Sequence, residues 1–198
     1  MPNRKLALSF IFLTALIDSI GFGILMPVLP NLYMEITGEG LAQAAIYGGW
    51  LLFAYAIMQF FFAPVLGNLS DAYGRKPVLM ASMIALCVNY LIMGFAGSLL
   101  VLFIGRFVSG IGAATFSTCN AYIADTIPVE ERAQYFGLTG AAFGAGFVIG
   151  PVLGGFLGEI GSRVPFFATS ALIFANLIMG LLFLPESLGK EKRRSFDI

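Results

Sequence analysis

The sequence contains no histidine and few charges: 11% of its 198 residues are charged, and 11 Lys+Arg balance 11 Asp+Glu. Histidine is the commonest general base and metal ligand, so its absence excludes most catalytic and metal-site chemistries. The balanced charge leaves no basic surplus to neutralise a nucleic-acid backbone. From these absences we predict a chain that is not an enzyme, holds no metal and does not bind nucleic acid.

Cofactor motifs are also missing. Cys87 and Cys119 both lie in apolar runs without CxxC spacing, which predicts inert core residues rather than a disulfide framework or a zinc site. The segment from Gly67 to Lys76 lacks the GxxxxGK[ST] pattern that cradles phosphates. We therefore expect no cofactor.

What the sequence has in excess is apolar surface. Hydrophobic residues make up 59% of the chain and the mean hydropathy is +0.90, which excludes a soluble globule. A hydrocarbon core of about 30 Å needs about 20 apolar residues per helix, so the distances between charges measure the spans. The stretch from Pro77 to Asp125 contains only Arg106 and is long enough for two crossings, with a turn at Gly97 and Ser98. The predicted fold is all-α, with six transmembrane helices at residues 6–29, 46–69, 77–96, 99–123, 134–158 and 164–184.

The cations predict the orientation of these spans, because Lys and Arg in short loops are retained on the cytoplasmic side. With the N-terminus inside, Arg163 alone falls outside and Arg106 lies within a span. The other nine of the eleven cations fall inside: Arg4, Lys5, Arg75, Lys76, Arg132, Lys190, Lys192, Arg193 and Arg194. We expect both termini to be cytoplasmic. The opening apolar stretch is interpreted as the first span, since no small-x-small cleavage site precedes Asp18.

The chain repeats itself once. Residues 64–67 and 151–154 both read Pro-Val-Leu-Gly, and an acid, an arginine and a proline recur after each at an offset of 88 residues. Each unit, about 6–96 and 99–184, holds three spans, so the second unit enters the membrane from the opposite face and the pair forms a 3+3 inverted repeat. The alternative is a chance recurrence of four residues in an apolar chain.

The same offset relates Asp18 to Arg106, the two charged residues within the spans. Helix geometry places them at similar depths, so the two side chains can meet. Charges near the middle of a bilayer are expensive and usually face a partner or a watery cavity. Two interpretations stay open. The residues form a structural ion pair, or Asp18 takes up and releases a proton while Arg106 stabilises its charged form.

Three segments resemble motifs of the major facilitator superfamily. Residues 67–77 resemble its loop signature, residues 106–110 its membrane arginine motif, and residues 146–155 the motif of its antiporters. The first-span segment 18–30, with its acid, is similar to the tetracycline/proton antiporter branch, as are residues 123–126 and 165–167. The likeness covers nearly the whole chain.

The resemblance assigns roles to particular residues. It implies a cytoplasmic gating loop in which Asp125 completes a charge relay with Arg75; the loop candidates are Gly67, Asp71, Gly74, Arg75, Lys76 and Asp125. The antiporter motif consists of Gly146, Gly150, Pro151, Gly154 and Gly155. Three of its glycines recur every four residues and leave a groove for another backbone, while the proline favours a bend. Ordinary helix packing without gating is the alternative.

Three departures from the family pattern qualify these roles. Ala72 stands where the loop signature usually has a second cation, which weakens the relay. Asn89 stands where an acid is expected in tetracycline exporters, which makes that drug a doubtful cargo; with Gln59 it is a candidate for the substrate cavity. The chain also ends where complete transporters continue into a second six-span half.

These observations predict the N-terminal half of a secondary transporter in the bacterial inner membrane. We expect proton-coupled efflux of small amphipathic molecules or drugs. Residues 1–188 form the bundle and 189–198 a basic cytoplasmic linker or tail. Its expected partners are the bilayer, protons, a small-molecule substrate, and either a missing C-terminal half or a second copy, because substrate sites in this fold lie between halves. The alternative is a non-transporting fragment or assembly subunit.

Overall fold

The computed structural model describes residues 4–194, apart from the side chain of Lys192, and every regular element in that range is helical. This confirms the all-α prediction. The elements are α1 (Arg4–Thr37), α2 (Leu41–Tyr73), α3 (Arg75–Phe95), α4 (Leu99–Ile111), α5 (Thr115–Thr126), α6 (Val129–Ile160), α7 (Val164–Phe183) and the short 3-10 helix η1 (Lys190–Lys192). Residues 195–198 of the predicted tail lie outside the described range.

Six segments are long and apolar enough to cross a membrane, as the charge spacing predicts. The helices extend further than the predicted spans. At 34 residues, α1 is about 50 Å long, against a hydrocarbon core of about 30 Å. Regular hydrogen bonding therefore continues beyond the apolar runs, and charged residues at helix ends fall within helices instead of loops.

The predicted fourth span, residues 99–123, is not one continuous helix. It divides into α4 and α5 at residues 112–114, where Ala113 donates to the carbonyl of Gly110 and Ala114 to that of Gly112. Close packing accompanies the break: a Cβ at Gly110 would lie 2.6 Å from the Tyr55 carbonyl oxygen of α2, and one at Gly112 would overlap Ala85 of α3. These hydrogen bonds span three and two residues instead of the four of an α-helix, so they tighten the last turn of α4 and then end it.

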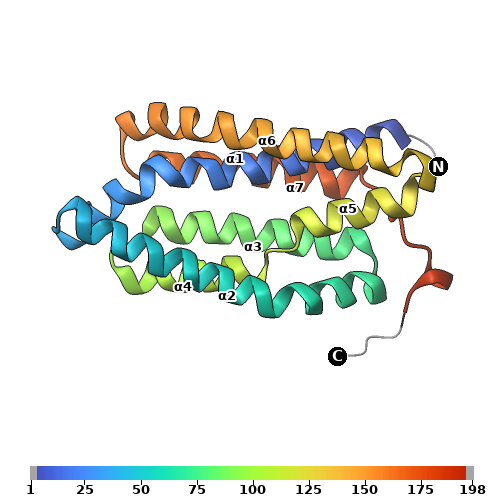
Figure 1. The fold of residues 1–198 in the computed structure, drawn as a ribbon, viewed down its shortest axis with the longest axis horizontal. Coiled ribbons are helices and arrows are strands. Elements are labelled where there is room, and N and C mark those ends of the chain that lie inside the picture. Colours follow the sequence, from blue (N-terminus) through green and yellow to red (C-terminus); the bar gives the residue numbers. More distant parts are fainter. Residues whose placement is uncertain (1–3, 195–198) are drawn as a thin grey trace.

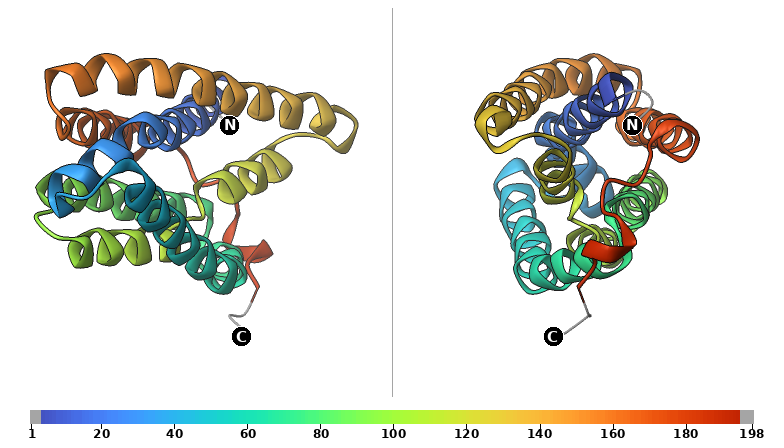
Figure 2. Two further views of the ribbon diagram at one scale, coloured as in Figure 1. Left: turned by 60° about the vertical axis from the view of Figure 1, so that its left-hand side comes forward. Right: turned by 90° about the vertical axis from the view of Figure 1, so that its right-hand side faces the viewer.

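The helices pack in the pattern that an inverted repeat requires (Figures 1 and 2). The principal pairs are α1 with α6, α2 with α4, and α3 with α7. Exchanging the first three spans with the last three turns the α1–α6 pair into the α4–α2 pair and maps α3–α7 onto itself. The packing therefore carries the same two-fold relation as the sequence offset.

The described part of the chain begins and finishes at the same end of the bundle (Figure 1). Arg4 and Arg194 lie there with the α2–α3 turn at Gly74 and the α5–α6 turn, and we call this the termini end. The α1–α2, α3–α4 and α6–α7 connections lie at the opposite end, which we call the far end. Within the bundle α1 is the most buried span, whereas most apolar side chains of α2 and α6 are at least partly exposed.

Candidate functional site

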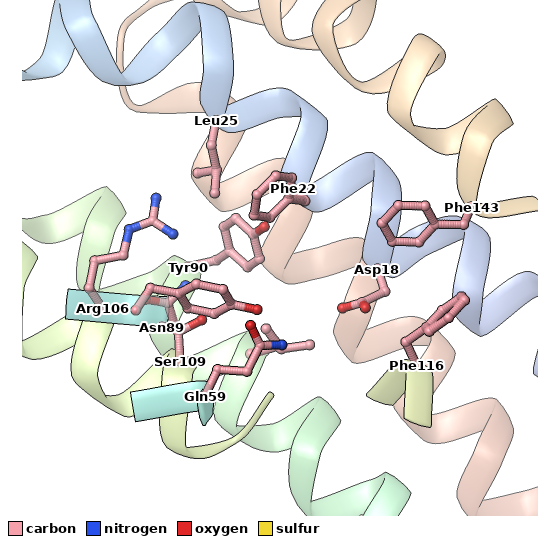
Figure 3. A pocket seen from close by; sticks show the side chains of 12 residues that line it. Asp18, Phe22, Leu25, Gln59, Asn89, Tyr90, Arg106, Ser109, Phe116 and Phe143 are labelled. Atoms are coloured by element: carbon pink, nitrogen blue, oxygen red, sulfur yellow. The ribbon is translucent and has the colours of Figure 1, made fainter. Parts of the chain in front are cut away.

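A cavity of about 480 Å³ lies inside the bundle (Figure 3). It is lined from both repeats by Asp18, Phe22, Leu25, Tyr55, Gln59, Leu86, Asn89, Tyr90, Arg106, Ser109, Phe116 and Phe143. The offset of 88 that relates Asp18 to Arg106 also relates Tyr55 to Phe143, so equivalent positions of the two repeats face one another across the space. The volume falls within the range of small-molecule sites.

Asp18 and Arg106 both line this cavity, but they do not pair. They approach from opposite sides, with the Asp18 carboxylate pointing into the space (Figure 3). Among the described residues no ion pair of 4.0 Å or less joins them. The structural ion pair considered from sequence is therefore wrong for this structure, because the cavity separates the two helices at this depth.

The polar surroundings of Arg106 are incompletely satisfied. The residue is 2% exposed, and its Nε and Nη2 atoms have no hydrogen-bond partner among the described residues. Asn89, 1% exposed, also leaves its Oδ1 without a partner and abuts α4 beside Gly105. Both sequence candidates for the substrate cavity, Gln59 and Asn89, line it.

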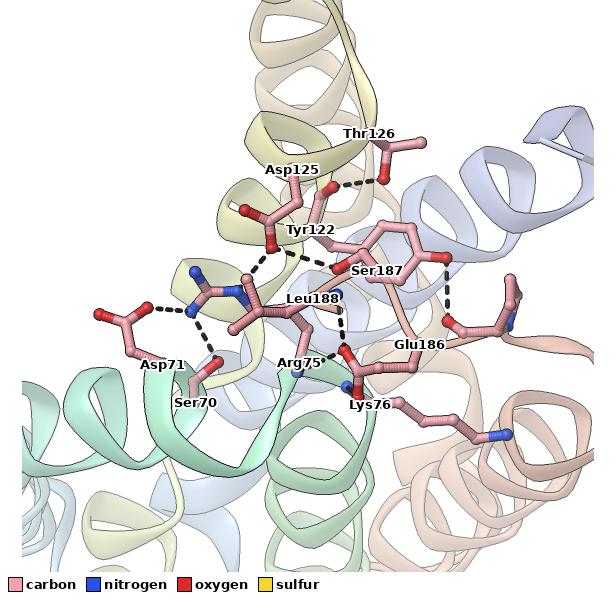
Figure 4. Close-up of polar contacts among 11 residues, drawn as sticks. Ser70, Asp71, Arg75, Lys76, Tyr122, Asp125, Thr126, Glu186, Ser187 and Leu188 are labelled. Atoms are coloured by element: carbon pink, nitrogen blue, oxygen red, sulfur yellow. Dashed lines mark hydrogen bonds and ion pairs between the residues drawn. The ribbon is translucent and has the colours of Figure 1, made fainter. Parts of the chain in front are cut away.

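A second cluster of charges lies at the termini end (Figure 4). Arg75 begins α3 and is 11% exposed; its Nη1 lies 2.6 Å from an Asp71 carboxylate oxygen and its Nε lies 2.8 Å from one of Asp125. The same Nη1 donates to Ser70 Oγ at 3.0 Å. One guanidinium thus ties the end of α2 and the end of α5 to the start of α3, which is the arrangement implied by the family resemblance.

Glu186 completes this cluster and was missed from the sequence. Its carboxylate accepts the backbone N–H groups of Arg75 at 2.8 Å and of Lys76 at 3.2 Å. These N–H groups are the first of α3 and have no acceptor within the helix, so Glu186 caps the helix. Its negative charge also interacts favourably with the positive N-terminal end of the helix dipole. Ser187, next in the chain, donates to Asp125 at 3.2 Å. The available signal was an acid following Pro185 directly after the last span.

Two members of the predicted gating loop lie elsewhere than expected. Gly67, a candidate for the loop, is exposed and lies within α2, which continues to Tyr73, so the connection to α3 is Gly74 alone. Gly74 has φ +110°, a conformation that favours glycine. Lys76 joins no ion pair in the described part of the chain; its Nζ donates to the carbonyl of Leu181 at 3.0 Å.

The antiporter-type glycines form the contact between α6 and α1. A Cβ at Gly146 would lie 2.6 Å from the Leu16 carbonyl oxygen, and one at Gly150 would lie 2.6 Å from that of Ile20. Gly154 makes the equivalent approach to Ile24, and Pro151 packs on Gly23 while α6 continues through it. Gly155 has open space around its Cβ position and takes no part in this contact.

A third cluster at the far end mirrors the cluster around Arg75. Arg163, 88 residues after Arg75, lies 3.3 Å from the Glu35 carboxylate and donates to the Gly94 carbonyl at 3.3 Å. Ser162 also donates to Glu35. Each arginine therefore precedes or opens the third helix of its repeat and binds an acid at the end of another helix.

The fold and the cavity define a class: a polytopic helical membrane domain built as an inverted repeat around a partly polar internal cavity, which is an architecture of secondary transporters. Within that class, the chain belongs to the Major Facilitator Superfamily, whose family model matches residues 11–197.

Several curated proteins are similar to this chain. The class C tetracycline resistance protein of Escherichia coli is 46% identical over 187 residues, covering 94% of this chain and 47% of the relative. The class H protein of Pasteurella multocida is 44% identical over 181 residues, covering 91% and 45%. Multidrug resistance protein 1 of Bacillus subtilis is 32% identical over 187 residues, covering 94% and 47%. The chain spans about half the length of these relatives.

A solved structure shares the fold. The crystal structure of the human organic anion transporter MFSD10 (TETRAN) matches with a TM-score of 0.82 and 25% identity, over 98% of this chain and 50% of that one. The chain is therefore similar to half of a full-length transporter in both sequence and structure.

Proposed function

We propose that the chain is the N-terminal half of a proton-coupled exporter of small amphipathic molecules. The observation that carries this proposal is a pair of opposite charges that line one cavity and form no ion pair among the described residues, the buried Arg106 and the partly exposed Asp18. A protein with a purely structural role gains nothing from two separated charges in a membrane interior, where each is costly. A transporter uses them to bind and release a proton and a cargo.

The relatives support efflux as the direction of transport. Their names describe resistance to tetracycline and to multiple drugs, and the name of the structural neighbour describes an organic anion transporter. We infer a small-molecule cargo for this chain, and transport rather than enzymatic catalysis as its activity. The competing assembly-subunit role makes no use of the charged cavity.

We propose that the complete transporter needs a second wall, supplied by a C-terminal half or by a second copy. The chain covers about half of its relatives, and most apolar side chains of α2 and α6 are at least partly exposed. On this proposal residues 1–188 form one bundle of repeats at about 6–96 and 99–184, and residues 189–198 lead toward the second half.

We further propose that the termini end faces the cytoplasm of a bacterial cell, with the bundle in its inner membrane. Nine of the eleven cations belong to segments at that end, which the retention of Lys and Arg in cytoplasmic loops favours. The Arg75 cluster would then act as the cytoplasmic gate. Its residues join three helix ends, so breaking it would release them together.

The test is a hybrid in which this chain is fused to the C-terminal half of the class C tetracycline resistance protein, reconstituted in vesicles with an imposed pH gradient. We expect gradient-driven uptake of tetracycline or ethidium into inverted vesicles. Asp18→Asn should reduce that uptake at least tenfold while leaving the amount of inserted protein unchanged. Uptake that proceeds equally with Asp18→Asn would exclude proton coupling through this residue. A folded hybrid that transports neither compound would favour the assembly role.

A further inference from the structure

A second pocket, of about 420 Å³, lies between α1 and α2, which diverge from their connection at the far end (Figure 1). We call it the α1–α2 slot. Its α1 wall includes Phe22, Leu25, Leu29 and Tyr33, and none of the residues that line it is charged. The helical rise from Phe22 to Tyr33 is about 16 Å, so the slot extends for much of one leaflet.

The α2 wall of the slot consists mainly of small residues. They are Ala44, Ala45, Gly48 and Gly49. Small residues in membrane helices usually bring two backbones together, as Gly150 does between α6 and α1. Here they do not: a Cβ at Gly49 would meet nothing within 4 Å, and one at Gly48 would meet only the ring of Tyr33, at 3.4 Å. The space between the two helices is therefore left open.

The slot opens toward the bilayer. Met26 of α1 and Leu52 of α2 are 52% and 48% exposed, whereas Leu25 and Leu29 are 5% and 7% exposed and form the floor. Positions 26 and 52 fall within the predicted spans 6–29 and 46–69, so the opening lies at the depth of the hydrocarbon. Apolar groups reach such an opening without the desolvation cost that a charged group would meet there.

Among the residues that line the slot, Tyr33 alone carries a polar side-chain group. It is 1% exposed, and its hydroxyl has no hydrogen-bond partner among the described residues. The cation that acts on this hydroxyl is Arg106, and a guanidinium donates but cannot accept, so the hydroxyl proton still lacks an acceptor. A buried hydroxyl without a hydrogen bond is costly. The slot therefore suits a ligand that brings an acceptor oxygen to Tyr33.

The depth of Tyr33 indicates which acceptor this is. The residue lies four positions, about 6 Å, beyond the end of the predicted span 6–29, and its side chain leans back toward the N-terminus of α1. The hydroxyl thus lies near the boundary between headgroups and hydrocarbon, where tyrosine is common in membrane proteins. The acceptors that a bilayer holds at this boundary are the ester carbonyls of its phospholipids, each attached to an apolar chain.

We propose that the α1–α2 slot binds one acyl chain of a phospholipid from the leaflet at the far end. The ester carbonyl accepts from the Tyr33 hydroxyl, and the chain extends along α1 toward Phe22. An acyl chain gains little hydrophobic energy by leaving the bilayer, so the hydrogen bond and the filling of open space select the bound lipid. Phe22 and Leu25 also line the central cavity, so the lipid chain supports a wall of that cavity.

The test measures lipid binding to the full 198-residue chain in detergent by native mass spectrometry. The probes are dioleoyl phosphatidylethanolamine and its dioleyl ether analogue, which has the same headgroup and chain length but no carbonyls. We expect the first ester lipid to bind about two- to tenfold more tightly than the first ether lipid, which is the net worth of one hydrogen bond. Dioleoyl phosphatidylglycerol, with a different headgroup, should bind like the phosphatidylethanolamine.

Variants assign the lipid to the slot. Tyr33→Phe removes the donor, so the ester lipid should weaken to the level of the ether analogue, whose own affinity should not change. Gly49→Leu fills the open space and should weaken the first lipid of either kind at least tenfold. Gly67→Leu is the matched control, because this glycine is exposed on the same helix, outside the slot and with nothing near its Cβ position, so both affinities should stay as they are.

Several results would overturn the proposal. They are equal affinity of the ester and ether lipids, an affinity that follows the headgroup, equal losses in Gly49→Leu and Gly67→Leu, or no saturable first lipid. Loss of the bound lipid in the hybrid with a C-terminal half would assign the slot to that half and overturn it as well. If Gly49→Leu does not fold, the Tyr33→Phe comparison decides alone. Binding is measured without transport, so the outcome is independent of the proposed function.

Discussion

At the scale of single residues, the structure separates the two charges that the sequence allowed to pair, and it joins Arg75 to Asp125, as the family resemblance implied. Asp18 and Arg106 face one cavity without contact, whereas Arg75 binds Asp71 and Asp125. The difference follows from position. Near a helix end a long side chain reaches acids on neighbouring ends, while in mid-membrane the cavity lies between the charges.

Glu186 gives a stability prediction at this scale. Glu186→Ala removes the acceptor of two N–H groups that open α3, and losing such a cap costs about 1 kcal/mol. We expect a lower midpoint of thermal unfolding, followed by circular dichroism in detergent. Glu191→Ala, which removes an exposed acid from η1, is the control and should leave the midpoint in place. Equal midpoints for both variants would show that the cap is not needed for stability.

At the scale of elements, the contact between α1 and α6 depends on backbone approach rather than side-chain interlocking. Gly146, Gly150 and Gly154 bring α6 against carbonyl oxygens of α1. The α2–α4 pair uses Gly110 in the same way, against Tyr55. Small residues serve this purpose in membranes because lipid supplies no hydrophobic force to press helices together, so close van der Waals contact must.

This contact predicts opposite effects for two neighbouring glycines. In Gly150→Ala the new Cβ would lie 2.6 Å from the Ile20 carbonyl oxygen, so the helices must move apart at a cost of about 1–3 kcal/mol. In Gly155→Ala the Cβ meets open space, and the better helix propensity of alanine should leave stability unchanged or slightly higher. Thermal unfolding of the two variants in the same detergent measures the difference. Similar destabilisation by both would contradict the α1–α6 packing.

At the scale of the whole molecule, two charged clusters occupy equivalent places at opposite ends of the bundle. Arg75 with Asp125 holds the termini end, and Arg163 with Glu35 holds the far end. The inverted repeat explains the correspondence, since an operation that exchanges the repeats also exchanges the two ends. The central cavity lies between these clusters, lined by equivalent residues of both repeats.

The proposed orientation can be measured on intact bacterial cells. Glu39→Cys places a thiol at the far end, and Glu130→Cys places one at the termini end, both at exposed positions. The native Cys87 and Cys119 are 8% and 0% exposed, so they should contribute little background. We expect a membrane-impermeant maleimide to label Glu39→Cys alone, and both variants after the cells are opened. Labelling of Glu130→Cys in sealed cells would reverse the orientation.

Much of the site could be predicted from the sequence, because a charged residue in a membrane span is energetically costly and therefore conspicuous, and because regularly spaced glycines form a recognisable pattern. Charges inside apolar runs identified Asp18 and Arg106, and four-residue spacing identified the face of α6 that packs on α1. Glu186 lacked such a signal, because a carboxylate near a helix end is ordinary until another helix begins beside it. The break between α4 and α5 at residues 112–114 could not be predicted either, since two glycines in an apolar run also fit a continuous span.

The sequence by itself determined the membrane class, the six spans and the two-fold internal relation, because these depend on hydrophobic length and on residue order. Only the tertiary structure decided which charges touch, where the fourth span breaks and how wide the cavity is. The reason is physical. Burial and periodicity act along the chain, whereas an ion pair, a backbone contact or a cavity depends on distances between helices that residue order does not contain.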